Sequence, residues 1–125
     1  MALSRDMQVV TGFLEAWNRQ DLDGIASRLA PDVFYHNIPM EPVLGRDAVV
    51  AGLAPFVQGC TAVDWQVLHI ADTGSGAVLT ERVDNFVMGE KRMSVRVMGT
   101  FELRDGLITH WRDYFDLRAT KPQPR

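Results

Sequence analysis

The first third of the chain carries apolar residues at helical spacing. Over residues 4–20 they recur every three or four positions, and Ser4 is suited to cap the helix that this spacing predicts. The apolar positions of this helix are Val9, Val10, Phe13, Leu14 and Trp17. Asp21 can cap a short second helix, and a third helix is expected after Gly45. The pattern therefore predicts amphipathic helices near the start of the chain.

Between the second and third helices the pattern changes. Pro31 ends the second helix, because the residue before a proline is pushed away from helical angles. Residues 33–37 are rich in aromatic and β-branched side chains, which predicts a short strand. Residues 38–42 contain two prolines, so we expect an irregular loop there.

Beyond residue 59 the sequence is typical of long strands separated by turns. The strands are expected at residues 61–72, 77–88, 91–104 and 107–118. Asp105 and Gly106 favour a tight type I′ hairpin between the last two. Strands that follow one another through short turns pair antiparallel, so these four predict a meander.

Helices followed by an antiparallel sheet predict an α+β fold in which the helices cover one face of the sheet. A strongly twisted sheet of this kind would give a cone with an interior pocket. We expect a single domain over residues 1–118. Residues 119–125 contain two prolines and no apolar run, so a flexible C-terminal tail is expected there.

The last strand has a core-like face that is interrupted by an acid. Trp111, Asp113 and Phe115 point to the same side, since alternate residues of a strand share a face. A carboxylate among large apolar side chains loses its hydration, which raises its pKa unless donors or cations offset the loss. Asp113 is therefore expected to have polar partners.

Other strands offer such partners. Arg82 and Asp84 share a face about 7 Å apart, and the guanidinium could bond both Asp84 and Asp113 if these face one cavity. Two acids that share a cation can hold different protonation states, as an acid and a base must. Tyr35 and Asn37 also share a face and could hold a water molecule.

Each of these features has a structural alternative. Arg82 and Asp84 could form a solvated ion pair, and a bulge could turn Asp113 to solvent. Tyr35 and Asn37 could be a buried tyrosine and a turn amide. Cys60 fits a small buried hydrophobe.

Composition excludes several other functions. The chain has 125 residues, of which 46% are hydrophobic and 23% charged, and its net charge of −3 argues against nucleic-acid binding. The single cysteine excludes an internal disulfide, and the three histidines are too scattered for a short zinc motif. The sequence lacks an apolar run long enough for a membrane span, and its N-terminus lacks a signal-like apolar region. We therefore expect a cytoplasmic protein without metal, membrane or nucleic-acid partners.

Four blocks of the sequence together resemble the limonene-1,2-epoxide hydrolase family. The blocks are YHNIP at 35–39, GRDAV at 45–49, TERVD at 80–84 and ITHWRDYFDL at 108–117. They stand in the family's order and near its spacing. The resemblance implies the cone-shaped fold shared with nuclear transport factor 2, ketosteroid isomerase and polyketide cyclases, in which a strongly curved sheet surrounds a deep pocket. It also implies a homodimer.

The resemblance assigns a role to each polar candidate. Asp113 corresponds to the base that takes a proton from the attacking water, and Tyr35 and Asn37 correspond to the residues that hold this water. Asp84 corresponds to the acid that protonates the epoxide oxygen, and Arg82 to the residue that bridges the two aspartates. The reaction implied is the cofactor-independent hydration of an epoxide to a vicinal diol in one step.

The leading hypothesis is therefore an epoxide hydrolase that acts on a small apolar epoxide. A hydrophobic pocket is expected from Met40, Leu53, Trp65, Leu103, Trp111 and Phe115. Two alternatives remain at this point. One is a proton-transfer enzyme like ketosteroid isomerase or the polyketide cyclases, and the other is a non-catalytic module that binds an apolar ligand.

Overall fold

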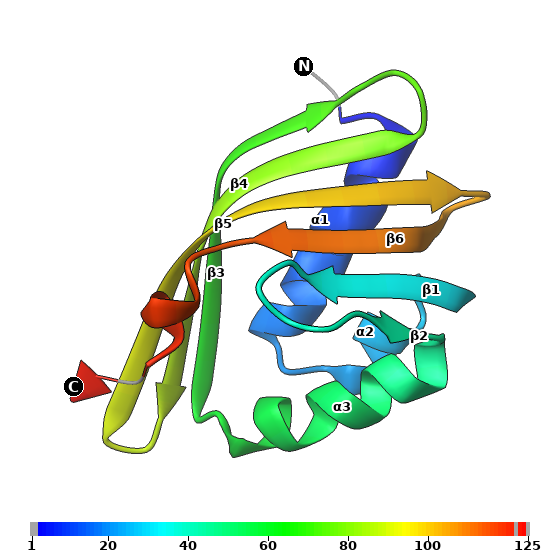
Figure 1. Cartoon of the computed structure of the whole chain (residues 1–125). Helices are drawn as coiled ribbons and strands as arrows, with labels where there is room; N and C mark the ends of the chain where they lie inside the picture. The colour runs from blue at the N-terminus through cyan, green and yellow to red at the C-terminus, as the bar shows by residue number, and fades with distance from the viewer. Residues whose placement is uncertain (1–2, 122, 125) are drawn as a thin grey trace.

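Helix α1 lies behind a long, bent sheet, and helix α3 lies beside one edge of it (Figure 1). The structure is a computed structural model and describes residues 3–121 and 123–124. The elements are α1 (Arg5–Asn18), α2 (Leu22–Ala26), β1 (Leu29–Asn37), β2 (Val43–Leu44), α3 (Arg46–Gly59), β3 (Ala62–Asp72), β4 (Ala77–Met88), β5 (Lys91–Arg104), β6 (Leu107–Tyr114), the 3-10 helix η1 (Leu117–Thr120) and β7 (Gln123–Pro124).

The helices begin where the capping residues predict. The Ser4 side chain accepts a hydrogen bond from the backbone N–H of Met7, and the Asp21 side chain accepts one from Gly24. Val10 and Phe13 of α1 are fully buried. The Phe13 ring meets Trp111 of β6 edge to face, with centroids 4.9 Å apart. Helix α1 thus packs its apolar face on the inner side of the sheet.

The strands form one mixed sheet in the order β2-β1-β6-β5-β4-β3, and β7 pairs with β5. The meander from β3 to β6 is antiparallel, as predicted, whereas β1 pairs parallel with β6. Strands β3, β4 and β5 bend strongly along their length, so the sheet wraps around its inner side (Figure 1). This curved α+β arrangement confirms the predicted fold class.

Strand β1 differs from its prediction. It begins at Leu29 rather than at residue 33 and includes Pro31. The pairing of β1 with β6 shifts register between Leu29 and Phe34, and a proline is accommodated at such an irregularity because no ladder bond is required of it there. The short strand β2 within the following segment was not predicted.

The end of the chain also differs. Strand β6 ends at Tyr114 rather than at residue 118, because the Asp116 side chain accepts a bond from the Arg118 N–H and caps η1. Residues 119 and 120 belong to η1, and Gln123–Pro124 pair with β5. The described part of the expected tail therefore carries regular structure, while its flexibility and the domain limit at residue 118 stay predictions.

Among the residues that the structure describes, no helix has the length and apolar character to cross a membrane.

Candidate active site

A polar cluster lies buried on the inner face of β4 and β6. The side chains of Arg82, Asp84 and Asp113 are 0%, 5% and 6% exposed. Alternation along β4 explains two of these positions, since Thr80, Arg82, Asp84 and Phe86 all point inward and all are buried. Asp113 reaches the same place from β6. The predicted proximity of the two aspartates and the arginine is therefore confirmed.

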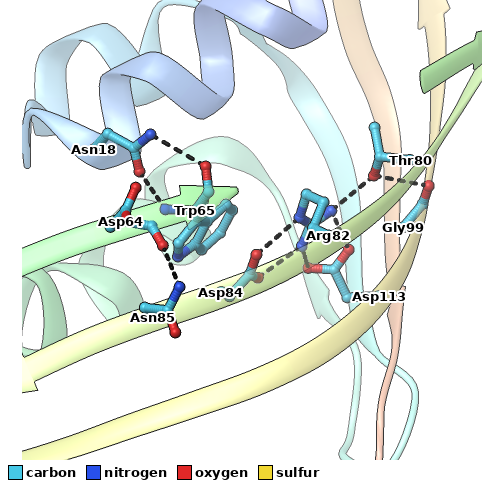
Figure 2. A network of polar contacts seen from close by, with 9 residues as sticks. All are labelled: Asn18, Asp64, Trp65, Thr80, Arg82, Asp84, Asn85, Gly99 and Asp113. Atoms are coloured by element: carbon cyan, nitrogen blue, oxygen red, sulfur yellow. Dashed lines mark hydrogen bonds and ion pairs between the residues drawn. The ribbon is translucent and has the colours of Figure 1, made fainter. Parts of the chain in front are cut away.

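Arg82 binds both carboxylates with two hydrogen bonds each (Figure 2). Towards Asp84, Nε donates to Oδ1 at 3.0 Å and Nη2 to Oδ2 at 2.8 Å. Towards Asp113, Nη1 donates to Oδ1 at 3.3 Å and Nη2 to Oδ2 at 3.0 Å. Paired bonds from the planar guanidinium fix the orientation of each carboxylate as well as its distance.

Burial and pairing set the charges of the cluster. Burial raises the pKa of Asp84 to about 6, although the hydrogen bonds and charge of Arg82 act to lower it. Burial alone would lower the pKa of Arg82, but the two aspartates raise it above its usual value, so the guanidinium stays charged. A single cation thus lies between two acids, and one of them, Asp84, binds a proton when the pH falls below about 6.

Tyr35 and Asn37 are brought to this cluster by β1. Asn37 pairs in register with Asp113 of the parallel strand β6, and Tyr35 pairs with Trp111. The Tyr35 ring stacks on Trp111 with centroids 4.0 Å apart. Burial, followed by the charge of Asp113, raises the pKa of Tyr35, so its hydroxyl remains neutral and can donate a hydrogen bond.

Trp65 of β3 forms one wall beside the arginine. The Arg82 guanidinium carbon lies 4.8 Å from the centre of the Trp65 ring, within the range of a cation–π interaction. The backbone of Trp65 is held by Asn18 at the end of α1, since its N–H donates to Asn18 Oδ1 at 2.7 Å and its carbonyl accepts from Nδ2 at 3.3 Å (Figure 2).

A cavity of about 300 Å³ opens beside the cluster. Its polar lining consists of Tyr35, Asn37, Asp84, Asp113 and Thr120. The rest is apolar and comprises Trp17, Met40, Leu53, Phe56, Trp65, Phe86, Met88, Met93, Val95, Val97 and Phe115. The acids therefore face a predominantly hydrophobic space of a size that suits a small ligand.

The structure separates the six expected pocket residues into two groups. The four that line the cavity are Met40, Leu53, Trp65 and Phe115. Leu103 and Trp111 lie outside this lining. Trp111 is fully buried behind Tyr35 and in contact with α1, and Leu103 follows an irregularity in the pairing of β5 with β6. Alternation gives the face of a residue but not its depth, which accounts for both differences.

Sequence reasoning missed several lining residues. On β5, Met93, Val95 and Val97 alternate with exposed Ser94 and Arg96, so the period of two contains the signal. Thr120 carried no signal, because the 3-10 helix that places it at the cavity was not predicted.

The arrangement can perform acid–base chemistry on a ligand held in the cavity. Asp84 and Asp113 both border this space, are joined through one cation and have Tyr35 and Asn37 beside them. Within the described residues, no three His, Cys, Asp or Glu side chains are grouped as metal ligands.

Comparison with known families identifies relatives of the chain. A sequence model of the limonene-1,2-epoxide hydrolase catalytic domain matches residues 4–122. The epoxide hydrolase EphG of Mycobacterium tuberculosis is 37% identical over 108 residues, which cover 86% of this chain and 71% of EphG.

Solved structures agree with the sequence relatives. The structure of an epoxide hydrolase from M. tuberculosis that is described as similar to limonene-1,2-epoxide hydrolase has a TM-score of 0.83. It is 34% identical, and the match covers 93% of this chain and 86% of that one. An NTF2-like protein of unknown function from Cytophaga hutchinsonii, 19% identical, has a TM-score of 0.77 over 94% of this chain and 95% of its own, which shows that the fold is NTF2-like.

Proposed function

The chain belongs to the limonene-1,2-epoxide hydrolase family and is an epoxide hydrolase, and from this premise we propose that Asp84 and Asp113 add water to the epoxide in one step. The observation that carries the proposal is the double pairing of Arg82, which holds one aspartate at each edge of its guanidinium inside a buried site.

The proposed step moves two protons and exchanges two bonds. Asp113 takes a proton from the water as the water oxygen bonds to an epoxide carbon. Tyr35 and Asn37 hold this water. Asp84 gives its proton to the epoxide oxygen as the ring C–O bond breaks, and the product is a vicinal diol. The pKa of about 6 for Asp84 supports its role as the acid, since general acids work best near the operating pH.

Charge balance favours the assignment of Asp84 as the acid and Asp113 as the base. With a proton on Asp84, the cluster holds the Arg82 cation and one carboxylate, so its net charge is zero. After the step the proton lies on Asp113 and the carboxylate on Asp84, and the net charge is again zero. A buried site in which the total charge does not change avoids the cost of desolvating a net charge. Return of the proton from Asp113 to Asp84 restores the starting state.

We propose a small apolar epoxide as substrate. The cavity of about 300 Å³ is lined mainly by aromatic and aliphatic side chains. Its described lining includes no Lys or Arg side chain that could pair with an anionic substrate. Asp84 and Asp113 supply the polar contacts that the epoxide oxygen and the attacking water need.

Oxygen labelling tests the proposed mechanism. In a single turnover with excess enzyme in ¹⁸O-water, one labelled oxygen should enter the diol, because the attacking oxygen comes directly from water. Label missing from the diol in this turnover would indicate attack by an aspartate and would contradict the one-step mechanism. Proton transfer without hydrolysis would put no label in the product at all.

Substitution of each acid tests its role. Asp84→Asn and Asp113→Asn should each lower kcat by about a thousandfold or more, since each removes one partner of the proton exchange. Glu102→Gln is the matched control, because Glu102 pairs with Arg112 on the opposite face of the sheet. Near wild-type turnover by either aspartate variant, with circular dichroism showing a folded protein, would contradict the proposal.

We also propose that the protein forms a homodimer through the outer face of the sheet. Leu68, Met98 and Tyr114 are about half exposed there and line a hollow together with Glu81 and Arg96. A twofold arrangement would bury these apolar side chains and set Arg96 against Glu81 of the second copy.

We propose the cytoplasm as the location. The single cysteine, Cys60, is buried and unpaired, which is compatible with a reducing compartment.

A further inference from the structure

Arg82 uses all of its N–H groups, and one of them goes to a residue outside the proposed acid–base set. A guanidinium has five N–H donors. Four bond the two aspartates, and the remaining Nη1 hydrogen is donated to Thr80 Oγ1 at 3.0 Å. Thr80 is 1% exposed, and its hydroxyl donates in turn to the carbonyl of Gly99 at 3.3 Å. The orientation of the Thr80 hydroxyl is thereby fixed.

Gly99 lies at the centre of this arrangement in the sheet. It pairs in register with Thr80 of β4 on one side and with Asp113 of β6 on the other. These residues and Asn37, which pairs with Asp113, form one row across four neighbouring strands. A side chain at Gly99 would point to the inner face, where Arg82 lies (Figure 2).

The space at Gly99 is already occupied by the cluster. A Cβ atom built there would lie 2.3 Å from Arg82 Nη1, 2.6 Å from Asp113 Oδ1 and 3.0 Å from Thr80 Oγ1. The backbone of Gly99 does not need glycine, since it is absent from the residues with positive φ. Glycine inside a strand costs stability because it loses more conformational entropy and packs no side chain. The close approach of these three polar atoms accounts for its presence.

We propose that Thr80 and Gly99 are positioning residues that place the Arg82 guanidinium between the two aspartates. The proposal rests on the function assigned above. Thr80 accepts the last Nη1 hydrogen and prevents rotation of the guanidinium away from Asp113, and Gly99 leaves the space in which Nη1 reaches Asp113. Neither residue lines the cavity, so neither contacts substrate.

Positioning predicts an effect on turnover rather than on substrate binding. Without the Thr80 acceptor, one donor of a fully buried cation has no partner, and the guanidinium shifts to find one. The bond from Nη1 to Asp113 Oδ1, at 3.3 Å, is the longest that Arg82 makes and is the first to be lost. A shift of about 1 Å in a reacting group can cost about a hundredfold in rate.

Two substitutions at Thr80 test the proposal, with kcat and KM measured on the epoxide that the wild-type protein hydrolyses fastest in a panel of small apolar epoxides. Thr80→Val keeps the shape of the side chain but removes the acceptor, and it should lower kcat by about tenfold to a hundredfold with KM changed by less than about twofold. Thr80→Ser keeps the hydroxyl and should restore kcat to within about threefold of wild type. Thr100→Val is the matched control, because Thr100 is the neighbour of Gly99 on the outer face, and it should leave kcat unchanged.

Gly99→Ala tests the same arrangement by placing a methyl group in the space that Arg82 Nη1 occupies. It also keeps the proposal testable should Thr80→Val not fold. It should lower kcat by about a hundredfold or more, whereas Gly52→Ala, with open space around its Cβ, should leave kcat unchanged. Wild-type kcat in a folded Thr80→Val or Gly99→Ala protein would overturn the proposal. So would a Thr80→Ser protein as slow as Thr80→Val, since the hydroxyl would then not be the cause.

Failure of this proposal is distinguishable from failure of the proposed function. If Asp84→Asn and Asp113→Asn abolish turnover but the Thr80 and Gly99 variants do not reduce it, only the positioning role is wrong. If the aspartate variants retain turnover, the proposed function is wrong, whatever the Thr80 variants do.

Discussion

Each face of the sheet carries an arginine bound to acids, two on the inner face and one on the outer face, and the two clusters also differ in exposure. On the inner face, Arg82 binds Asp84 and Asp113 with its side chain fully buried. On the outer face, Arg112 donates to Glu102 at 2.6 Å with their side chains 25% and 42% exposed. The shorter bond belongs to the more exposed pair.

This difference shows that distance alone does not indicate a functional pair. Water can replace either partner of the outer pair. An N–H group of Arg112 without an acceptor in the protein can therefore bond water instead. Around Arg82 every N–H group has an acceptor within the protein, and a neighbouring strand carries glycine to make room. Burial makes complete pairing necessary, and it also shifts the pKa of Asp84 into a useful range.

The largest expected difference between the two faces comes from replacing the arginine of each face by methionine. Arg82→Met leaves two buried acids without a cation and should cost about 3–5 kcal/mol in unfolding free energy. It should also lower kcat by about a hundredfold or more. Arg112→Met should cost less than about 1 kcal/mol and leave kcat unchanged. Denaturant unfolding and steady-state turnover of both variants measure the contrast, and equal losses from the two faces would contradict it.

A smaller effect is expected from pH. Asp84 must carry a proton to act as the acid, so kcat/KM should fall as the pH rises through about 6, where Asp84 loses this proton. The folded protein binds this proton more tightly than the unfolded chain, so the unfolding free energy should also decrease as the pH rises from 3.8 to about 6.

A pH series of kcat/KM and of denaturant unfolding checks both expectations. Glu15→Gln, which alters an exposed carboxylate on α1, is the control and should keep the wild-type profile. Activity that rises with pH through this range would contradict the assignment of Asp84 as the acid.

The smallest effect on turnover is expected from the outer face. Met98→Glu places a charge in the proposed dimer contact, so light scattering should show half the mass of the wild-type protein. The inner face should be unaffected, with kcat within about twofold. Leu44→Glu, on β2, makes the same kind of change at another exposed apolar position and should keep the wild-type mass. A wild-type protein that is monomeric would contradict the dimer.

Much of the site could be predicted because it depends on alternation along single strands. The spacing of Arg82 and Asp84 alone predicts that they share one face of β4, and alternation along β6 places Asp113 among apolar neighbours. The role of Gly99 could not be found so, because it depends on the register between β4, β5 and β6. That register is set by the packing of the whole sheet and leaves no local pattern.

Local irregularities account for the other differences in the fold. The register shift in β1 allows a proline inside a strand, and the Asp116 cap ends β6 early and starts η1. Both depend on contacts of one or two residues that a hydrophobic pattern does not record. The lining residue Thr120 was missed for the same reason.

The hydrogen bonds of Asn18 have a consequence for the solution behaviour of the protein. Strand β3 is at an edge of the sheet, and an edge strand presents unpaired backbone groups to which another chain can add. The Asn18 amide occupies both the N–H and the carbonyl of Trp65, as a paired strand would do. One side chain at the end of a helix therefore fills the place that a strand of another chain would take at Trp65, the residue whose ring shields the Arg82 cation.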